Sequence, residues 1–150
     1  EIRKFCAWLV GVDISKAMLQ EAEKKTIYNR LERRSIVDFL STTILDFDYF
    51  VAADVFIYLG ELSDVFRLIK TRNKRAGKLV FSIEKYGGDE FFLEQSGRYS
   101  HSQNYIEKLC KEYGFHSSFY MDIEVRKEQD RFIAGGLYIL EFYPAHSCKA

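Results

Sequence analysis

The chain has 150 residues, of which 47% are hydrophobic and 29% are charged, and its formal net charge at pH 7 is zero. This length corresponds to one domain with a buried core, and the composition is that of an ordinary globular protein. The lack of a basic excess argues against a dedicated nucleic-acid-binding protein. Aromatic residues make up 16% of the chain, which predicts a core rich in rings.

The cysteines and histidines show no pattern typical of a disulfide scaffold or a metal site. Cys6, Cys110 and Cys148 are far apart and odd in number, so we expect reduced thiols in an intracellular protein. His116 and His146 lack the spacing of metal ligands, and we expect no metal. No apolar run is long enough to span a bilayer and no signal peptide opens the chain. The sequence therefore predicts a cytoplasmic protein.

The N-terminal third of the chain predicts an alternation of helices and strands. Residues 2–9 carry apolar side chains at helical spacing. Residues 9–13, LVGVD, form a short apolar run typical of a buried strand. Ser15 is a good N-cap for the helix that follows this strand. Residues 33–38 weakly indicate a further strand.

The central third continues the alternation. Residues 48–56 are a continuous apolar run and predict a buried strand. Apolar positions at i, i+3, i+4 and i+7 predict an amphipathic helix over residues 61–74. Residues 78–83, KLVFSI, predict another buried strand.

The C-terminal third ends differently. Residues 85–100 look irregular, and a helix is expected from about Ser102 to its C-cap at Gly114. Residues 117–128 and 132–143 are two β-prone runs with a short polar connection, which predicts an antiparallel hairpin. Alternating helices and strands predict an α/β fold, with a mostly parallel sheet and helices on both faces. We expect one domain over residues 1–150.

Acidic residues stand where four of the predicted strands end, which is where ligands bind in α/β sheets. Asp13 follows a buried strand, and a carboxylate there accepts hydrogen bonds from a ribose diol. The alternative is a carboxylate that favours the dipole of the next helix. We favour the ribose interpretation, because Ser15 is the better cap. Asp38 ends the weak strand, and either meets an adenine amino group or is a solvated loop residue.

Asp54 closes the strongest central strand. The small residues Ala52 and Ala53 precede it and would let a ligand approach the backbone. The alternative is an acid that starts the next helix. We favour a ligand site, because the pattern falls at the carboxyl end of the strand. Tyr58 and Gly60 follow at once.

The stretch SGRYSHS, residues 96–102, is polar and rich in hydrogen-bonding groups. Arg98, Tyr99 and His101 together are typical of a substrate loop. A lone histidine beside a helix start is equally often a surface or capping residue, so both interpretations stay open. Glu84 ends the strand 78–83, and we expect it at the same edge of the sheet.

Five segments of the chain share a resemblance. They are GVDISKAMLQEAEKK, FDYFVAADVFIYLGEL, GKLVFSIEK, SGRYSHSQNYIEKLCKEYGF and the closing hairpin. In order and spacing they resemble the class I S-adenosylmethionine-dependent methyltransferases, and most of all the bacterial predicted methyltransferases that often carry tetratricopeptide repeats. The resemblance implies a Rossmann-like sheet with an antiparallel last strand. It also implies S-adenosyl-L-methionine as cofactor and methyl transfer to an unidentified small molecule or protein.

The resemblance further implies roles for single residues in cofactor binding. Asp13 matches the acid that holds the ribose, and Ile14 and Met18 lie where residues pack near the adenosine. Asp38 matches the acid that meets the adenine.

Other residues match the part of the family that faces the methyl group. Ala53 and Asp54 match the segment beside the methionine part of the cofactor. Tyr58 and residues 96–102 would face the acceptor. Tyr58 and His101 are the candidates for a general base, if the acceptor needs one.

The chain departs from the family in one respect. The first strand and its acid-x-G-x-G loop should precede residues 2–9 and are absent, and Gly11 does not replace them. Because the chain begins at Glu1 without Met, we expect an N-terminally incomplete methyltransferase-like domain. A missing central strand would expose sheet edges, so we also expect self-association.

Two other functions compete with methyl transfer. The absent loop favours a non-catalytic binding or assembly module that keeps the fold. A nicotinamide-dependent oxidoreductase also holds ribose with a strand-end acid. The closing hairpin and the lack of a G-x-G-x-x-G motif argue against it.

Overall fold

The chain forms two compact units in the computed structural model, which describes residues 2–128 and 131–144. One unit comprises Glu1–Thr43 and the other Ile44–Ala150. Each has its own sheet, one of two strands and one of six. No helix in the described part of the chain is long and apolar enough to cross a membrane.

The N-terminal unit is a short βαβ unit followed by a helix. Its elements are η1 (Ile2–Phe5), β1 (Val10–Asp13), α1 (Lys16–Lys24), β2 (Arg30–Arg33) and α2 (Ile36–Thr42). Strands β1 and β2 pair in parallel, and α1 connects them. Ser15 caps α1, because its side chain accepts a hydrogen bond from the backbone N–H of Met18. The predicted strand 9–13 and its helix cap are therefore confirmed.

Two predictions for the N-terminal unit are wrong. The helix predicted over residues 2–9 is only a 3₁₀ turn of four residues. The strand predicted over residues 33–38 does not exist, because β2 ends at Arg33 and α2 begins at Ile36. The side chain of Ser35 accepts the N–H of Asp38 at 3.1 Å and starts this helix. The β-branched pair after Ser35 imitates a strand, but the cap decides for a helix.

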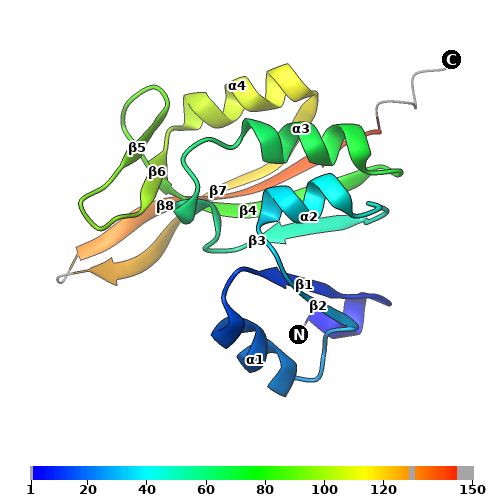
Figure 1. Cartoon of the computed structure of the whole chain (residues 1–150). Helices are drawn as coiled ribbons and strands as arrows, with labels where there is room; N and C mark the ends of the chain where they lie inside the picture. Colours follow the sequence, from blue (N-terminus) through cyan, green and yellow to red (C-terminus); the bar gives the residue numbers. More distant parts are fainter. Residues whose placement is uncertain (1, 129–130, 145–150) are drawn as a thin grey trace, which may run out of the picture. The chain divides into compact units, whose positions relative to one another are not determined.

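The C-terminal unit is a mixed sheet with helices. Its elements are β3 (Tyr49–Ala52), η2 (Phe56–Tyr58), α3 (Ser63–Arg72), β4 (Gly77–Lys85), β5 (Phe91–Leu93), β6 (Tyr99–His101), α4 (Gln103–Tyr113), β7 (Phe115–Glu128) and β8 (Arg131–Phe142). Strand β4 is central: β3 and β6 pair with it in parallel, and β8 pairs with it antiparallel. Figure 1 shows β4 between β3 and the long hairpin.

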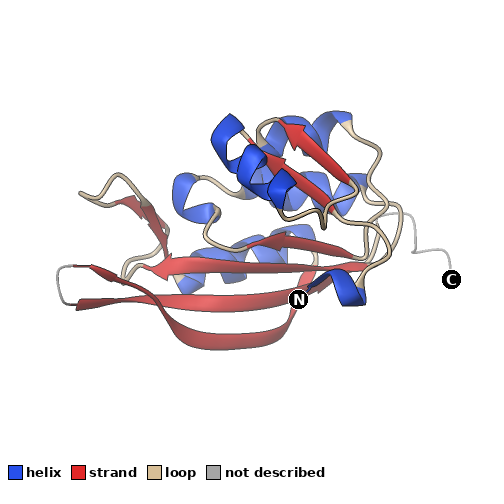
Figure 2. Cartoon of the chain, turned by 90° about the horizontal axis from the view of Figure 1, so that it is seen from below, coloured by secondary structure: helices blue, strands red, loops and turns tan. Residues whose placement is uncertain are grey.

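The end of the chain confirms the predictions for its helix and hairpin. Ser102 caps α4, and Gly114 ends it with a left-handed φ of 70°. Strands β7 and β8 pair antiparallel, and Figure 2 shows them running side by side. Residues 129–130, in the predicted connection, lie outside the described residues. The stretch 85–100 is not irregular throughout, since it holds β5 and the start of β6. Strands of three residues are too short to show a periodicity.

The core of the C-terminal unit is built from aromatic rings, as the composition predicts. Helices α3 and α4 lie on the same face of the sheet. Phe81 of β4 stacks on Tyr138 of β8, with ring centroids 5.1 Å apart. Phe66 of α3 packs edge-on against Phe81 at 6.1 Å. Phe66 and Phe81 are almost completely buried, and each such ring contributes about 1.5–3 kcal/mol by leaving water.

Candidate functional site

Asp13 ends β1 and is half-buried. Its Oδ1 accepts a hydrogen bond from the backbone N–H of Ser15 at 2.7 Å, so the carboxylate helps to start α1. Its Oδ2 has no hydrogen-bond partner among the residues that the structure describes. The helix-initiating interpretation is therefore confirmed for one oxygen. The second oxygen leaves the predicted contact with a ribose possible, and that contact stays a prediction.

The other predicted cofactor residues of the N-terminal unit are solvent-exposed. Ile14 and Met18 are 69% and 57% exposed, so two apolar side chains within five residues of Asp13 are accessible to a ligand. Asp38 is also exposed, but it lies in the first turn of α2 and not at a strand end. There its charge favours the helix dipole. Its predicted contact with an adenine rested partly on a strand predicted over residues 33–38, which the structure does not contain.

Asp54 lies at a sharp turn just after β3. Its φ of 53° is left-handed, which is uncommon for a residue with a side chain. The backbone N–H of Asp54 donates to the Oγ of Ser82 on β4 at 3.0 Å, and this bond helps to hold the turn. Ala53 and Asp54 are both exposed. Strained backbone of this kind is often found at ligand sites.

A cluster of side chains surrounds Gly60, which follows η2. His101 on β6 is completely buried, and its Nε2 lies 3.0 Å from the carbonyl oxygen of Gly60. A Cβ on Gly60 would lie 2.7 Å from the ring of Tyr99 and 2.8 Å from that of Phe91. Only glycine fits there without a shift of these rings. Tyr58, two residues earlier, is 62% exposed.

Hydrogen bonds extend this cluster into the start of α3. The hydroxyl of Tyr105 donates to Glu61 Oε1 at 2.6 Å and accepts the backbone N–H of Leu62 at 2.8 Å. The hydroxyl of Ser63 also donates to Glu61, at 2.6 Å. Burial acts to raise the pKa of Glu61, but the hydrogen bonds from Ser63 and Tyr105 together lower it. Burial and the bond to Glu61 raise the pKa of Tyr105, so its hydroxyl keeps its proton.

Burial also determines the charge of His101. Burial lowers the pKa of this imidazole. The carbonyls of Gly60 and Leu59 and the charge of Glu61 act to raise the pKa, but the effect of burial is larger. The ring is therefore neutral at pH 7. Because a carbonyl oxygen only accepts, the proton of the neutral ring sits on Nε2. Nδ1 finds no partner among the described residues.

The stretch 96–102 is not the open loop that the sequence indicates. Tyr99–His101 form β6, and Ser102 caps α4. The backbone carbonyl of Arg98 accepts the N–H of Glu94 at 2.8 Å in the turn before β6. Arg98 and Tyr99 are half-buried. Of the predicted acceptor residues, Tyr58 is thus the most accessible, and contacts of Arg98 and Tyr99 with an acceptor stay a prediction.

Glu84 lies in β4, close to its carboxyl end, but it does not face solvent. It is 3% exposed and forms an ion pair with Arg126 of β7. A second contact joins Arg126 Nη2 to Glu84 Oε2 at 3.5 Å. This carboxylate is therefore paired within the sheet, and the charge of Arg126 compensates its own charge.

Sequence reasoning missed three residues of this region. Ser82 reads as a polar position within an apolar strand, Glu61 as a helix residue and Tyr105 as a core residue. The pattern Ala-Ala-Asp-x-x-x-Tyr-x-Gly-Glu was the available signal for Glu61, since it continues the predicted ligand turn. Ser82 and Tyr105 gave none, because their partners lie 28 and 44 residues away.

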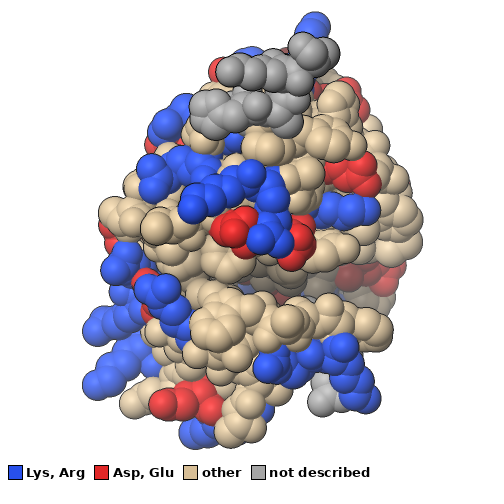
Figure 3. Space-filling view, turned by 90° about the vertical axis from the view of Figure 1, so that its right-hand side faces the viewer, with Lys and Arg blue, Asp and Glu red and all other residues tan. Residues whose placement is uncertain are grey.

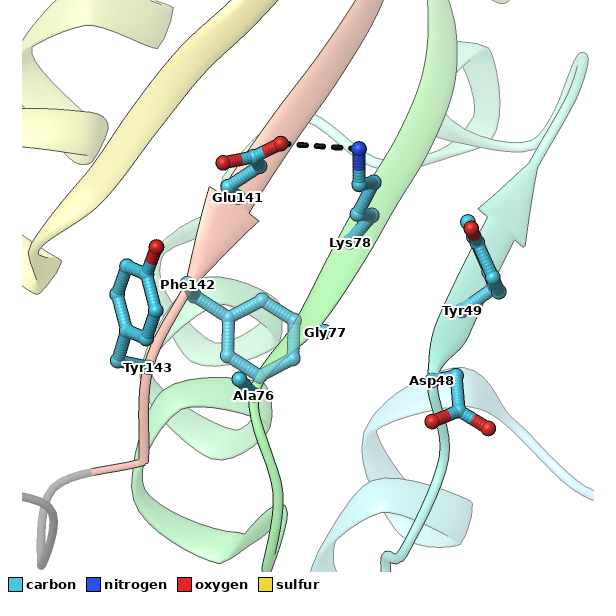
Figure 4. Close-up of a pocket in the computed structure, with 8 residues that line it drawn as sticks. All are labelled: Asp48, Tyr49, Ala76, Gly77, Lys78, Glu141, Phe142 and Tyr143. Atoms are coloured by element: carbon cyan, nitrogen blue, oxygen red, sulfur yellow. Dashed lines mark ion pairs between the residues drawn. The ribbon is translucent and has the colours of Figure 1, made fainter.

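A hollow of about 290 Å³ opens at the other end of β3 and β4. It is lined by Asp48, Tyr49, Ala76, Gly77, Lys78, Glu141, Phe142 and Tyr143. Figure 4 shows Lys78 pointing toward Glu141, with 2.9 Å between Nζ and Oε1. The hydrogen bond to Glu141 raises the pKa of Lys78. The hollow includes none of the predicted site residues and lies at the amino ends of the parallel strands, so we assign it no cofactor.

The basic cluster at residues 70–75 has structural partners. Lys70 and Arg72 lie in the last turn of α3, where they favour the helix dipole. Arg75 bridges Asp46 at 2.6 Å and Asp48 at 3.3 Å. Figure 3 shows such mixing of basic and acidic side chains on one face of the molecule. The cluster therefore gives no reason to assign an anionic partner.

The βαβ unit, the central parallel strands and the antiparallel hairpin together define a Rossmann-like methyltransferase fold, which solved structures match. No protein-family model matches the chain, and no curated protein sequence matches it. The N-methyltransferase NodS from Bradyrhizobium japonicum WM9, in complex with S-adenosyl-L-homocysteine, aligns with a TM-score of 0.70 at 17% identity. The alignment covers 91% of this chain and 67% of NodS.

Two further structures give the same result. A putative S-adenosylmethionine-dependent methyltransferase from Listeria monocytogenes aligns with a TM-score of 0.69 at 17% identity, over 90% of this chain and 80% of its own. A methyltransferase from Methanosarcina mazei aligns with a TM-score of 0.68 at 13% identity, over 90% and 82%. The predicted fold class is therefore confirmed.

Proposed function

We propose that the protein is a methyltransferase that uses S-adenosyl-L-methionine and acts on a small molecule or a protein. The observation that carries this proposal is the methyltransferase fold, in which Asp13 ends β1 and Asp54 follows β3, each strand being paired in parallel within its own unit. We also propose that, among methyltransferases, the protein is most similar to those associated with tetratricopeptide repeats.

The residues of the chain fit the cofactor chemically. Oδ2 of Asp13 would accept a hydroxyl of the ribose, and the exposed side chains of Ile14 and Met18 would cover the adenosine. The exposed turn of Ala53 and Asp54 lets a ligand approach the backbone beside the methionine part. Asp38 is the weakest member of the set, because it lies in α2.

The chain's own contribution to the reaction would be to position the two reactants. When bound, the cofactor would supply a methyl group on a positively charged sulfur. The acceptor would bond to that methyl carbon as the carbon–sulfur bond breaks, with S-adenosyl-L-homocysteine as the leaving group. Alignment of donor and acceptor supplies most of the rate enhancement in such a reaction. Tyr58 has an exposed side chain near Asp54 in sequence and would contact the acceptor. It is a better candidate for proton transfer than His101, whose ring is buried.

Free sheet edges support the expected self-association. Among the described residues, β1 pairs only with β2, and β3 pairs only with β4. Unpaired strand edges recruit further strands. Sedimentation velocity over a range of protein concentrations should show a dimer or larger species. A monomer at all concentrations would contradict this part of the proposal.

Calorimetric titration of S-adenosyl-L-methionine and S-adenosyl-L-homocysteine into the chain tests the function. We expect both to bind, and Asp13→Asn to weaken binding about tenfold or more, since a hydrogen bond to a charged group is worth about 1.5–3 kcal/mol. Glu21→Gln, in the exposed part of α1, is the matched control and should bind like wild type. Absence of binding to the wild-type chain would refute the proposal and favour a non-catalytic module.

A further inference from the structure

The segment from Asp54 to Leu62 connects β3 to α3 and is fixed at both ends. At its start, Ser82 accepts the N–H of Asp54. At its end, Tyr105 binds both the side chain of Glu61 and the backbone of Leu62. The exposed Tyr58 lies between these two anchors.

A third anchor lies close to Tyr58. The Nε2–H of His101 donates to the carbonyl of Gly60, at a distance of 3.0 Å. The His101 ring is completely buried and stacks on Tyr105, with ring centroids 5.9 Å apart. Phe91, which pairs with His101 across β5 and β6, covers it at 6.1 Å. These rings leave His101 little freedom to turn away from Gly60.

A histidine with a purely structural role at this position would be energetically unfavourable. Its Nδ1 is buried without a partner among the described residues, and an unsatisfied buried polar atom costs about 1–3 kcal/mol. An apolar residue would fill the same space without this cost. Within the described part of the chain, Nε2–H is the part of the ring that makes a hydrogen bond, and its partner is the segment that carries Tyr58.

We propose that His101 is a positioning residue, which holds the segment 54–60 through a hydrogen bond to the Gly60 carbonyl. It thereby fixes the positions from which Asp54 contacts the cofactor and Tyr58 contacts the acceptor. This inference rests on the proposed function, because that function assigns ligands to Asp54 and Tyr58. It differs from the sequence-based hypothesis of a general base. The imidazole touches neither reactant and acts through the backbone.

Two substitutions separate the hydrogen bond from the space that the ring fills. His101→Gln places an amide N–H donor at a similar distance from the backbone. His101→Met fills similar space without a donor. Gln95→Ala, in the exposed turn before β6, is the neutral control. Each variant is measured for thermal unfolding, for its dissociation constant with S-adenosyl-L-homocysteine, and for amide hydrogen exchange in residues 54–62.

We expect His101→Met to weaken the binding of S-adenosyl-L-homocysteine about tenfold. Hydrogen exchange of the amides at residues 58–62 should become faster by a similar factor. His101→Gln should restore both values to within about twofold of wild type. Gly60→Ala should imitate His101→Met, because its methyl group would collide with the rings of Tyr99 and Phe91.

Three results would overturn the inference. His101→Met with a lower melting temperature but wild-type affinity and exchange would show a purely structural residue. Failure of His101→Gln to restore affinity, at a wild-type melting temperature, would show that the imidazole itself contacts the ligand. Unchanged exchange at residues 58–62 in His101→Met would also contradict it. If the wild-type chain binds no S-adenosyl-L-homocysteine, the proposed function fails, and the exchange measurement still decides whether His101 holds the segment.

Discussion

The two units of the molecule are packed very differently. In residues 3–43 the buried apolar residues are Phe39 and Leu40, both on α2, while α1 buries none of its residues. The unit from residue 44 contains all the other buried apolar residues of the described chain. Segments of about forty residues rarely fold stably alone. The residues expected to hold the cofactor's adenosine thus lie in the unit with the smaller buried core. Those expected to face the acceptor lie in the unit with the larger core.

The largest difference between the units should appear when a buried ion pair is broken. Arg126→Met leaves the buried carboxylate of Glu84 without its guanidinium and should cost about 3–5 kcal/mol of unfolding free energy in urea. Arg34→Met should cost about 1 kcal/mol or less, because Arg34 is partly exposed and Glu32 keeps Arg30.

The double variant Glu84→Leu/Arg126→Met is the control for this prediction. It removes both charges and should recover most of the lost stability. A loss of less than 1 kcal/mol in Arg126→Met would contradict a buried ion pair. Breaking an ion pair would then cost about the same unfolding free energy in both units.

A ligand should reduce the difference between the units. If S-adenosyl-L-homocysteine binds to Asp13 and its neighbours, a hundredfold excess over its dissociation constant should stabilise the folded state by about 2.7 kcal/mol. Amide hydrogen exchange should slow most in residues 10–24 and less in the core strand β4. Equal protection in both units would contradict this, and Asp13→Asn should abolish the effect.

Equivalent helix caps offer a matched test. Ser102 caps α4 from a buried position at 3.0 Å, and Ser15 caps α1 from a half-buried position at 3.4 Å. We expect Ser102→Ala to cost about 2 kcal/mol and Ser15→Ala about 0.5 kcal/mol, as measured by chemical unfolding. Equal losses would show that burial does not set the strength of these caps.

The smallest expected effect is a dependence of stability on pH that belongs to the C-terminal unit. Burial lowers the pKa of His101 below its ordinary value of 6.5, so the unfolded chain binds more protons there than the folded one. This contribution to stability is fully present above pH 6.5 and is lost as the pH falls, by at most about 1.4 kcal/mol per pH unit. His101→Gln should flatten the profile between pH 5 and 6.5 relative to Gln95→Ala. Identical profiles would contradict a buried neutral ring.

Several elements could be predicted from the sequence because their signals are local. Ser15 and Ser102 each accept an N–H three residues later, and Gly114 adopts the left-handed conformation that ends α4. The same holds for the closing hairpin, because two β-prone runs with a short polar connection predict its two strands. Strand β1 was found from its apolar run, and with it the position of Asp13.

The remaining features were decided by contacts between distant residues. Helix α2 was missed because its β-branched start imitates a strand. The bond from Asp54 to Ser82 spans 28 residues, that from His101 to Gly60 spans 41, and the ion pair of Glu84 and Arg126 spans 42. The sequence by itself determined the order of most elements and the acids at their ends, because caps and periodicity act within a few residues. The tertiary structure decided which of these groups are buried, since burial depends on strands that meet only in the folded sheet.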